Sequence, residues 1–276
     1  MEVQQSTLYQ QYILALGWSV DTLDGSAIFY RKLPFIGVMA KIQRPMTLPY
    51  IPKLIPLLQK LHVRTLLVEP KANEDPEVFK NYIHSLSKFF KIILSPFLPT
   101  KTILVNVTPT EEKIFSSLEP AKRRAVRRAE KYGISISSSN DIDDLIAIKS
   151  KAAGTFGSMT TYGIDKLWNI FYKKQQSHIL LAKTSEKKVV GGVLLLLSGS
   201  TCYYWIAGAT KKGKHMFAPT LLVWEALKFA HGKKCTYFDF VGVWDERKPK
   251  QYTEWKGFTK FKEGFGGKEL YYPLAK

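Results

Sequence analysis

Two groups of basic side chains in this sequence have surroundings suited to anion chemistry. Six of the ten residues from Lys122 to Lys131 are Lys or Arg, and Glu130 is the one acid among them. Guanidinium groups at this density are typical of a surface that binds phosphate oxygens. Lys262 stands just before a glycine cluster, Gly264, Gly266 and Gly267, where we expect backbone to approach a ligand closely. A lysine there can donate hydrogen bonds to a carboxylate, a phosphate or an oxyanion.

The charge of the whole chain indicates the same class of partner. The 276 residues include 41 Lys and Arg against 23 Asp and Glu, which gives a formal net charge of +18. Such a protein attracts the phosphates of nucleic acids, nucleotides or anionic lipid surfaces. A hydrophobic fraction of 45%, with 16 Phe, 14 Tyr and 6 Trp, excludes a disordered chain and predicts a sizeable core.

Several other classes of protein are excluded by features that the sequence lacks. The longest apolar run, Val189 to Leu197, is far shorter than the ~20 residues of a membrane-spanning helix. Only two cysteines are present, Cys202 and Cys235, and the histidines show no metal-ligand spacing, so we expect neither a disulfide framework nor a metal site. The segment from Met1 to Tyr12 lacks the features of a secretion signal, and a reducing, cytoplasmic compartment is therefore expected.

Hydrophobic periodicity predicts alternating strands and helices that position these basic groups. In the first half we expect a hairpin around Asp24-Gly25, a further strand, a helix after Pro49, a strand, a second helix and a last strand; the strands are 19–23, 27–32, 38–43, 63–68 and 103–107, and the second helix is 76–90. In the second half we expect strands at 179–183, 189–197, 201–207 and 236–240, with a helix that begins at Pro219.

The two halves share a pattern that predicts a repeated unit. Pro49 precedes Glu69 by 20 residues, and Pro219 precedes Asp239 by the same number. Apolar residues stand at the second, fifth and eighth positions after each proline, so one strand, helix, strand unit is used twice. The sequence therefore predicts an α/β fold of two similar domains, residues 1–108 and 109–276, each with a mixed sheet flanked by helices.

The basic segment is predicted to be a helix from about Ser116 to Gly133. Ser117 can cap it, Pro120 suits a first turn and Gly133 suits its end. An apolar stripe would then pack against the protein, formed by Ala121, Ala125, Ala129 and Tyr132. We interpret the remaining arc, with Arg124, Arg127 and Arg128, as an anion-binding face, with a merely solvated charged face as the alternative.

Several of these motifs, in their order, resemble the FemABX family of peptidoglycan bridge-forming aminoacyltransferases. The resemblance rests on the basic helix, residues 124–134, and on four later segments: residues 203–210, the helix start at 218–224, the strand 237–240 with Gly242, and Phe261-Lys262-Glu263-Gly264-Phe265-Gly266-Gly267. In the first half the similarity lies in Gln4-Gln5-Ser6, Gly17-Trp18 and Arg44-Pro45. It implies two tandem acyl-CoA N-acyltransferase-like (GNAT) domains. Many members carry a helical arm in the second domain, and no room for one is evident here.

The resemblance also implies an activity and roles for individual residues. The reaction is transfer of an aminoacyl group from aminoacyl-tRNA to an amine on the stem peptide of a peptidoglycan precursor. By family analogy Lys262 is the catalytic cationic donor to the oxyanion. Substrate binding is assigned to Arg124, Arg127, Arg128, Tyr203, Tyr204, Trp205, Phe261 and Arg44, and a core role for the aromatic residues stays open. Members that act on nucleotide-linked precursors have a basic residue shortly before the N-terminal Trp. Leu14, Ala15 and Leu16 stand there instead, and the candidate replacements are Lys32, Lys41 and Arg44.

The resulting expectations for partners are aminoacyl-tRNA as co-substrate, a nucleotide-linked or lipid-linked muropeptide as acceptor, and no cofactor. We expect a monomer, with peripheral contact to the anionic inner face of the membrane. Two alternatives remain. An acyl-CoA N-acyltransferase would need a Gly-rich turn before a helix, whereas the segment from Lys211 to Pro219 has only one glycine. A basic RNA-binding module would explain the charge but gives the Phe261-Lys262 motif no role.

Overall fold

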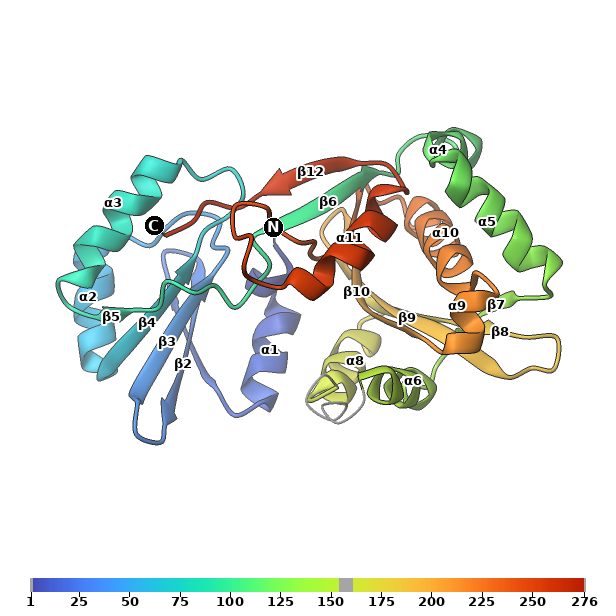
Figure 1. The fold of residues 1–276 in the computed structure, drawn as a ribbon. Helices are drawn as coiled ribbons and strands as arrows, with labels where there is room; N and C mark the ends of the chain where they lie inside the picture. Colours follow the sequence, from blue (N-terminus) through green and yellow to red (C-terminus); the bar gives the residue numbers. More distant parts are fainter. Residues whose placement is uncertain (1, 154–160, 276) are drawn as a thin grey trace. The chain divides into compact units, whose positions relative to one another are not determined.

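The computed structural model describes residues 2–153 and 161–275 (Figure 1). The chain divides into two compact units. The first contains Met1–Lys101 together with the C-terminal segment Leu270–Lys276, and the second contains Thr102–Glu269.

The first unit is built on a five-stranded mixed sheet with the order β1-β2-β3-β4-β5. Strands β1 (Ser19–Leu23), β2 (Ser26–Leu33) and β3 (Gly37–Gln43) form an antiparallel meander, and β4 (Val63–Glu69) and β5 (Lys91–Ile92) add to it in parallel. The turn between β1 and β2 places Asp24 and Gly25 at φ values of 49° and 76°, as a two-residue hairpin turn requires. The expected hairpin is confirmed.

Three α-helices cover the two faces of this sheet (Figure 1). Helices α2 (Ile51–Lys60) and α3 (Pro76–Ser87) bury Leu54, Leu58 and Phe79 against Ile28, Ile42 and their neighbours on the strands. On the other face of the sheet, Phe29 packs against helix α1 (Thr7–Ala15). The rings of Phe29 and Tyr9 are in edge-on contact, with their centroids 6.1 Å apart. Ser6 begins α1 by accepting a hydrogen bond from the N–H of Tyr9, which is an N-cap that the sequence interpretation missed.

The second unit has a seven-stranded sheet with the order β12-β6-β11-β10-β9-β8-β7. Its antiparallel run comprises β7 (Ser135–Ser139), β8 (Ser177–Lys183), β9 (Val189–Ser198) and β10 (Thr201–Ala209). Strand β11 (Tyr237–Asp239) pairs with β10 in parallel and with β6 (Lys101–Asn106) antiparallel, and β12 (Lys268–Tyr271) closes the edge.

Helices lie on both faces of this second sheet. Helix α10 (Ala218–Gly232) packs on one face together with α4 (Glu111–Ser117) and α5 (Pro120–Lys131), and α6 (Asp143–Ala153) packs on the other. Two glycines of β9 allow these helices to approach the sheet closely. A Cβ on Gly191 would lie 3.1 Å from Leu222 of α10, and one on Gly192 would lie 3.2 Å from Leu145 of α6. Within its described residues the unit also contains the α-helices α8 (Ile164–Tyr172), α9 (Lys211–His215) and α11 (Lys256–Glu263).

The predicted repeat is present as two parallel crossovers, β3-α2-β4 and β10-α10-β11. The expected fold class, two GNAT-like domains with mixed sheets flanked by helices, is confirmed. The division of the chain differs from the expected 1–108 and 109–276 at both ends of the second unit. Strand β6 joins the second sheet, and Leu270–Lys276 returns to the first unit, where the N–H of Tyr272 donates to the carbonyl of Thr100 at 2.9 Å.

The predicted basic helix is α5, with Pro120 in its first turn as expected, but Ser117 does not cap it. Ser117 ends α4, and α5 begins at Pro120 after Leu118 and Glu119 adopt extended conformations, which is the usual effect of a proline on the residue before it. The buried face of α5 is formed by Val126 and Ala129. The stripe predicted from alanine spacing is therefore wrong in part, because Ala121 and Tyr132 are exposed.

Candidate active site

The parallel strands β10 and β11 separate at their carboxyl ends, and this point defines the candidate site. They pair only from Thr201 to Tyr203, opposite Tyr237 to Asp239, although β10 continues to Ala209 along β9. A β-bulge between Tyr204 and Ile206 bends β10 away at Trp205. The carboxyl ends of parallel strands are where α/β sheets bind ligands, because backbone groups there are not used by the ladder.

Lys262, from the last turn of α11, lies at this divergence. Its Nζ donates hydrogen bonds to the carbonyl of Phe240 at 2.9 Å and to the carbonyl of Gly242 at 2.6 Å, both on the segment that follows β11. The ring centroids of Phe258 and Phe240 lie 5.2 and 5.9 Å from the same nitrogen. A lysine ammonium has three N–H donors, so the third remains for an acceptor that enters the site.

The electrostatic surroundings lower the proton affinity of this lysine. Burial is the main cause of a pKa lowered to about 8; the Asp239 carboxylate opposes the shift and the charge of Lys149 reinforces it. Burial also lowers the pKa of Lys149, which lies on α6. No spacing in the sequence relates Lys149 to Lys262, and the structure places them in electrostatic contact. The site is therefore cationic, and with a pKa of about 8 the ammonium form of Lys262 prevails at neutral pH.

The backbone that holds Lys262 is itself strained. Val241 lies between the two carbonyls that bind the ammonium and has φ 65°, a left-handed conformation that a β-branched residue rarely adopts. Its N–H donates to Oδ1 of Asp239 at 2.6 Å, and the Thr102 hydroxyl donates to the same oxygen. Asp239 thus fixes a turn that orients two carbonyls toward one lysine, which is a strained arrangement typical of functional sites.

The predicted aromatic site residues fall into two groups. Tyr204 is buried in the core, where its ring meets Phe238 and Phe240 and where burial raises the pKa of its hydroxyl well above the usual value. Phe261 packs against this core and stacks edge-on with Phe265. Tyr203 is buried as the register partner of Asp239, and Trp205 is half-buried at the bulge. The structure therefore places Tyr203 beside Asp239 and Trp205 at the bulge, whereas Tyr204 and Phe261 pack in the core.

The three predicted arginines form one exposed surface of α5. Arg124, Arg127 and Arg128 are exposed, with the guanidinium of Arg127 5.7 Å from the Phe115 ring and that of Arg128 5.8 Å from the Phe217 ring. None of the three forms an ion pair within the described parts of the chain. They are available to an anion in solution, and we refer to them as the arginine face.

The glycine cluster beside Lys262 has a different role from the expected one. A Cβ on Gly264 would lie 2.3 Å from Lys122 of α5, and one on Gly267 would lie 2.6 Å from the carbonyl oxygen of Leu104 on β6. Gly266 and Gly267 also have φ values of 76° and 97°. The expectation that these glycines let backbone approach a ligand is thus corrected: they let α11 and its following turn pack onto α5 and β6.

Arg44, predicted to bind substrate, is instead held inside the first unit. It is 5% exposed, its guanidinium stacks 3.6 Å from the Tyr272 ring, and it donates to the carbonyl of Pro99 and pairs with Glu2. These partners tie the two chain ends to the sheet. The resulting arrangement corrects the expectation that its guanidinium is presented to a substrate.

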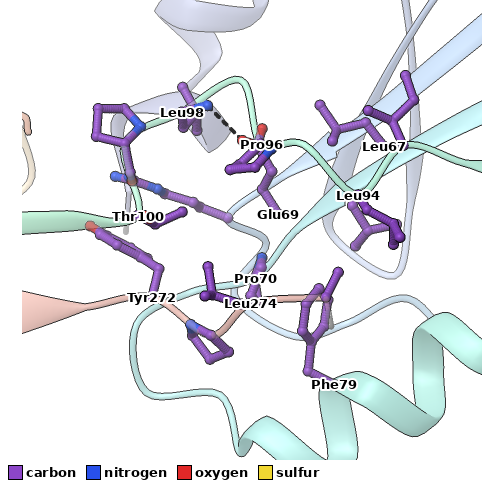
Figure 2. Close-up of a pocket in the computed structure, with 16 residues that line it drawn as sticks. Leu67, Glu69, Pro70, Phe79, Leu94, Pro96, Leu98, Thr100, Tyr272 and Leu274 are labelled. Atoms are coloured by element: carbon purple, nitrogen blue, oxygen red, sulfur yellow. Dashed lines mark hydrogen bonds between the residues drawn. The ribbon is translucent and has the colours of Figure 1, made fainter. Parts of the chain in front are cut away.

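Arg44 also lines a small pocket of the first unit, together with Glu69, Leu98 and Tyr272 (Figure 2). One oxygen of Glu69 accepts hydrogen bonds from the N–H groups of Phe97 and Leu98, and the other accepts one from the side chain of Gln43. The cavity volume of about 30 Å³ corresponds to roughly one water molecule, so the pocket is too small for a substrate.

Lys32 and Lys41 are the other two candidates for the basic substrate contact that is missing before Trp18. Of the two, Lys41 has the more unusual environment. It is 8% exposed, its ammonium lies 4.4 Å from the Trp18 ring, and burial lowers its pKa to about 8, with Glu69 opposing the shift. Lys32, in contrast, is exposed near the β2–β3 turn.

The turn between β10 and α10 is the place where a CoA pyrophosphate would need free backbone amides. Here the short helix α9 occupies it. The N–H groups of Gly213 and Lys214 donate to Thr210, and those of Met216 and Phe217 donate to Lys212 and Lys214. A Cβ on Gly213 would lie 2.2 Å from the carbonyl of Val190, so this turn is packed onto β9.

Comparisons with known proteins agree with this architecture. Residues 121–257 match the family described as acetyltransferase (GNAT) domain. Among solved structures, FemX aligns with a TM-score of 0.74 at 15% identity and covers 98% of this chain and 90% of its own. The C-terminal domain of a putative lysylphosphatidylglycerol synthetase from Agrobacterium fabrum aligns with a TM-score of 0.63 at 12% identity, with the same coverages. A tandem GNAT protein from the clavulanic acid biosynthesis pathway aligns with a TM-score of 0.54 at 10% identity, covering 92% of this chain and 82% of its own. Curated protein sequences give no significant match.

The described residues include no helix with both the length and the hydropathy to cross a membrane. They also contain no group of three or more His, Cys, Asp or Glu side chains arranged to hold a metal ion. The resemblance noted in the sequence motifs is confirmed at the level of the fold. Residues 121–257 therefore match a GNAT domain, and the chain as a whole is similar in fold to FemX and to a tandem GNAT protein.

Proposed function

We propose that this protein transfers an aminoacyl group from aminoacyl-tRNA to an amine of a peptidoglycan precursor stem peptide. The observation that carries the proposal is Lys262, whose ammonium is held by two carbonyls at the divergence of β10 and β11 and keeps one N–H donor. A preorganised cationic donor of this kind stabilises the oxyanion of acyl transfer. The fold likeness to FemX, and to a protein named for an aminoacylated lipid, supports the aminoacyl class.

In the proposed step the neutral acceptor amine attacks the ester carbonyl that joins the amino acid to the tRNA ribose. The new C–N bond forms a tetrahedral oxyanion, to which Lys262 donates its third hydrogen bond. The ester C–O bond then breaks, and the proton lost by the amine ends on the released ribose hydroxyl. The product is an amide, and no covalent enzyme intermediate is required.

The arginine face gives the proposal its tRNA contact. Arg124, Arg127 and Arg128 are exposed on one helix of the same unit and lack ion pairs among the described residues. Binding of phosphates to such a face is strongest at low salt, because it releases counterions from the nucleic acid. Tyr203 and Trp205, beside Asp239 and at the bulge, are proposed to contact the aminoacyl or peptide moiety.

The acyl-CoA alternative is less well supported by the turn between β10 and α10. The amides that would cradle a pyrophosphate donate within the turn itself, to Thr210, Lys212 and Lys214. Weak binding of acetyl-CoA in calorimetry, beside tight binding of charged tRNA, would agree with the aminoacyl proposal.

The direct test is incubation with tRNA charged with a labelled amino acid and a muropeptide precursor, offered in nucleotide-linked and lipid-linked forms. We expect label to move to the peptide with the native protein and to be reduced by about 10²–10³ in rate with Lys262→Ala, as for loss of one oxyanion donor. Lys260→Ala, an exposed lysine of the same helix, is the matched control. The absence of transfer to either acceptor with a panel of charged tRNAs, or tight binding of acetyl-CoA, would contradict the proposal.

A further inference from the structure

One end of the first unit's sheet brings together four chain connections. Strands β3, β4 and β5 are parallel and begin at this end, where the β2–β3 turn also lies, because Leu33 pairs with Gly37 and Val38 pairs with Val63. Strand β1 starts here too, since Ser19 pairs with Tyr30. The segments at this end are residues 13–19, 30–38, 58–65 and 87–92, and we call them the basic end.

The charge of the basic end has one sign. Its four segments contain six Lys and Arg residues and no Asp or Glu, and all six cations are exposed: Arg31, Lys32, Lys60, Arg64, Lys88 and Lys91. His62 adds a seventh basic side chain. None of the six forms an ion pair within the described residues. The field at this end therefore attracts an extended anionic surface.

A protruding apolar tip stands among these cations. Phe35 lies at the apex of the β2–β3 turn with φ 62° and is fully exposed at 109%, and Ile36 beside it is 52% exposed. The hollow next to the tip is lined by Lys32, His62 and Arg64 together with the apolar residues Leu33, Pro34 and Val38. A tip of this composition can enter an apolar layer while its basic flanks stay at an anionic boundary.

The opposite end of the same sheet gives a contrast within the same unit. Its connections are residues 24–25, 44–50, 70–75 and 93–100, where Asp24, Glu74 and Asp75 stand beside Arg44 and Lys71. Exposed apolar side chains occur there as well, for example Leu94 and Phe97 at 55% and 54%. Exposure of apolar residues is therefore common to both ends, and the combination with unbalanced positive charge is specific to the basic end.

We propose that the basic end is a docking surface for an anionic lipid bilayer, with Phe35 and Ile36 inserted among the acyl chains and the six cations against the lipid phosphates. A bilayer fits better than RNA, because successive bases need several rings to stack on, and of the four residues Leu33, Pro34, Phe35 and Ile36 only Phe35 is aromatic. It also fits better than a second copy of the chain, since two surfaces of net positive charge repel each other. The inference does not depend on the reaction proposed for Lys262.

Co-sedimentation with vesicles tests the docking surface on the whole protein. We expect binding to vesicles of phosphatidylcholine and phosphatidylglycerol in equal parts, weaker binding at higher salt, and no binding to phosphatidylcholine alone. The variant Phe35→Asn with Ile36→Ser should weaken binding about tenfold or more. Asn tolerates the left-handed conformation at position 35, so this variant keeps the turn. The matched control is Leu94→Ser with Phe97→Asn at the opposite end, and it should bind like the native protein.

Variants that remove cations separate the electrostatic contribution to vesicle binding from the apolar contribution. Lys60→Gln with Arg64→Gln should weaken vesicle binding by about fivefold per cation and reduce its salt dependence. Lys53→Gln with Lys71→Gln, outside the basic end, should have little effect. Thermal unfolding of all variants, and transfer to a water-soluble acceptor peptide, should stay at native values.

The proposal is overturned if the native protein does not bind the anionic vesicles, or if the variants at the two ends weaken binding equally. It is also overturned if the Phe35 variant leaves vesicle binding intact but abolishes tRNA binding, or if light scattering shows a native dimer that this variant dissociates. Loss of vesicle binding with unchanged transfer to the soluble peptide supports docking and leaves the reaction at Lys262 unaffected.

Discussion

Replacing Lys262 with methionine removes the amine and keeps a side chain of similar length in the same buried position. If the third N–H of the ammonium binds the oxyanion, the rate of aminoacyl transfer should fall by about 10²–10³, which corresponds to about 3–4 kcal/mol of transition-state stabilisation. The affinity for charged tRNA should change little, because the arginine face is unaltered.

The structure also gives the expected effect on stability. Holding the ammonium at a pKa of about 8 rather than 10.5 costs the folded protein on the order of 3 kcal/mol at neutral pH. Methionine removes this cost but leaves the carbonyls of Phe240 and Gly242 without their donor, at about 1–3 kcal/mol each. The two effects are of similar size, so we expect the variant to fold with a free energy of unfolding within a few kcal/mol of native.

The pH dependence of the free energy of unfolding distinguishes an effect of the Lys262 charge from an effect of its side-chain shape. Between pH 8 and 10.5 the unfolded chain binds the Lys262 proton more tightly than the folded protein, so the native free energy of unfolding should rise with pH across this window. Below pH 8 both states are protonated and this contribution is constant. The methionine variant should show a smaller rise, because only the contribution of Lys41 remains, and denaturant titrations at a series of pH values would measure the difference.

Activity should follow the charged form of the same residue. With a pKa of about 8, about nine-tenths of Lys262 is ammonium at pH 7 and about one-tenth at pH 9, so the ratio of native to Lys262→Met rates should fall across this range. Lys262→Arg keeps a cation at both pH values and should lose this alkaline limb. A methionine variant with native rates, or a rate ratio independent of pH, would refute the reasoning.

Three further predictions concern residues other than Lys262. Val241→Asn should stabilise the protein by about 1 kcal/mol in chemical denaturation, because Asn adopts the left-handed conformation at φ 65° more readily than a β-branched residue. Lys41→Met should raise the free energy of unfolding at pH 7 by up to about 3 kcal/mol, because it removes a buried ammonium whose pKa is lowered to about 8. This gain over native should diminish from pH 8 toward 10.5, since the native lysine loses its proton in that window. Changing Arg124, Arg127 and Arg128 together to Gln should weaken tRNA binding at least about tenfold and reduce the slope of log affinity against log salt by about 2–3.

Each of these has a contrasting control. Val243 lies two residues further on, is buried and has a negative φ, so the same change to Asn should destabilise the protein. Lys53→Met, on an exposed lysine, should follow the native free energy of unfolding from pH 7 to 10, with a difference from native that does not depend on pH. Lys173→Gln with Lys174→Gln, exposed at the end of α8, should leave the salt slope nearly native. A stabilised Val243 variant, a destabilised Lys41 variant or an unchanged arginine variant would each contradict the corresponding explanation.

The sequence determined much of the fold because local chemistry and periodicity agree in the elements concerned. Asp24-Gly25 specifies its own hairpin turn, and the apolar spacing after Pro49 and Pro219 specifies two crossover helices. The alanine-based stripe on α5 failed because helical periodicity alone does not fix which arc faces α10; packing of Val126 and Ala129 decides it.

The candidate site was predictable only in part, for a related reason. Lys262, the arginine face and the aromatic residues of β10 are recognisable as residue types near turns and helices. Lys149 was missed because nothing in its local sequence distinguishes it, and its interaction with Lys262 spans more than 100 positions of the chain. Arg44 was assigned to substrate because the sequence does not show that Tyr272, from the far end of the chain, stacks on it.

By itself, then, the sequence determined the net positive charge, the repeated strand, helix, strand unit and the identity of the residues able to donate to an anion. The tertiary structure decided which of them do so, because only the fold defines burial and proximity. It places Lys262 against two carbonyls and lowers its pKa, packs the neighbouring glycines on β6 and α5, and gathers six dispersed cations at the end of the first sheet that also carries Phe35. Charge is a property of residue types, whereas desolvation and shared surfaces depend on contacts between residues far apart in the chain.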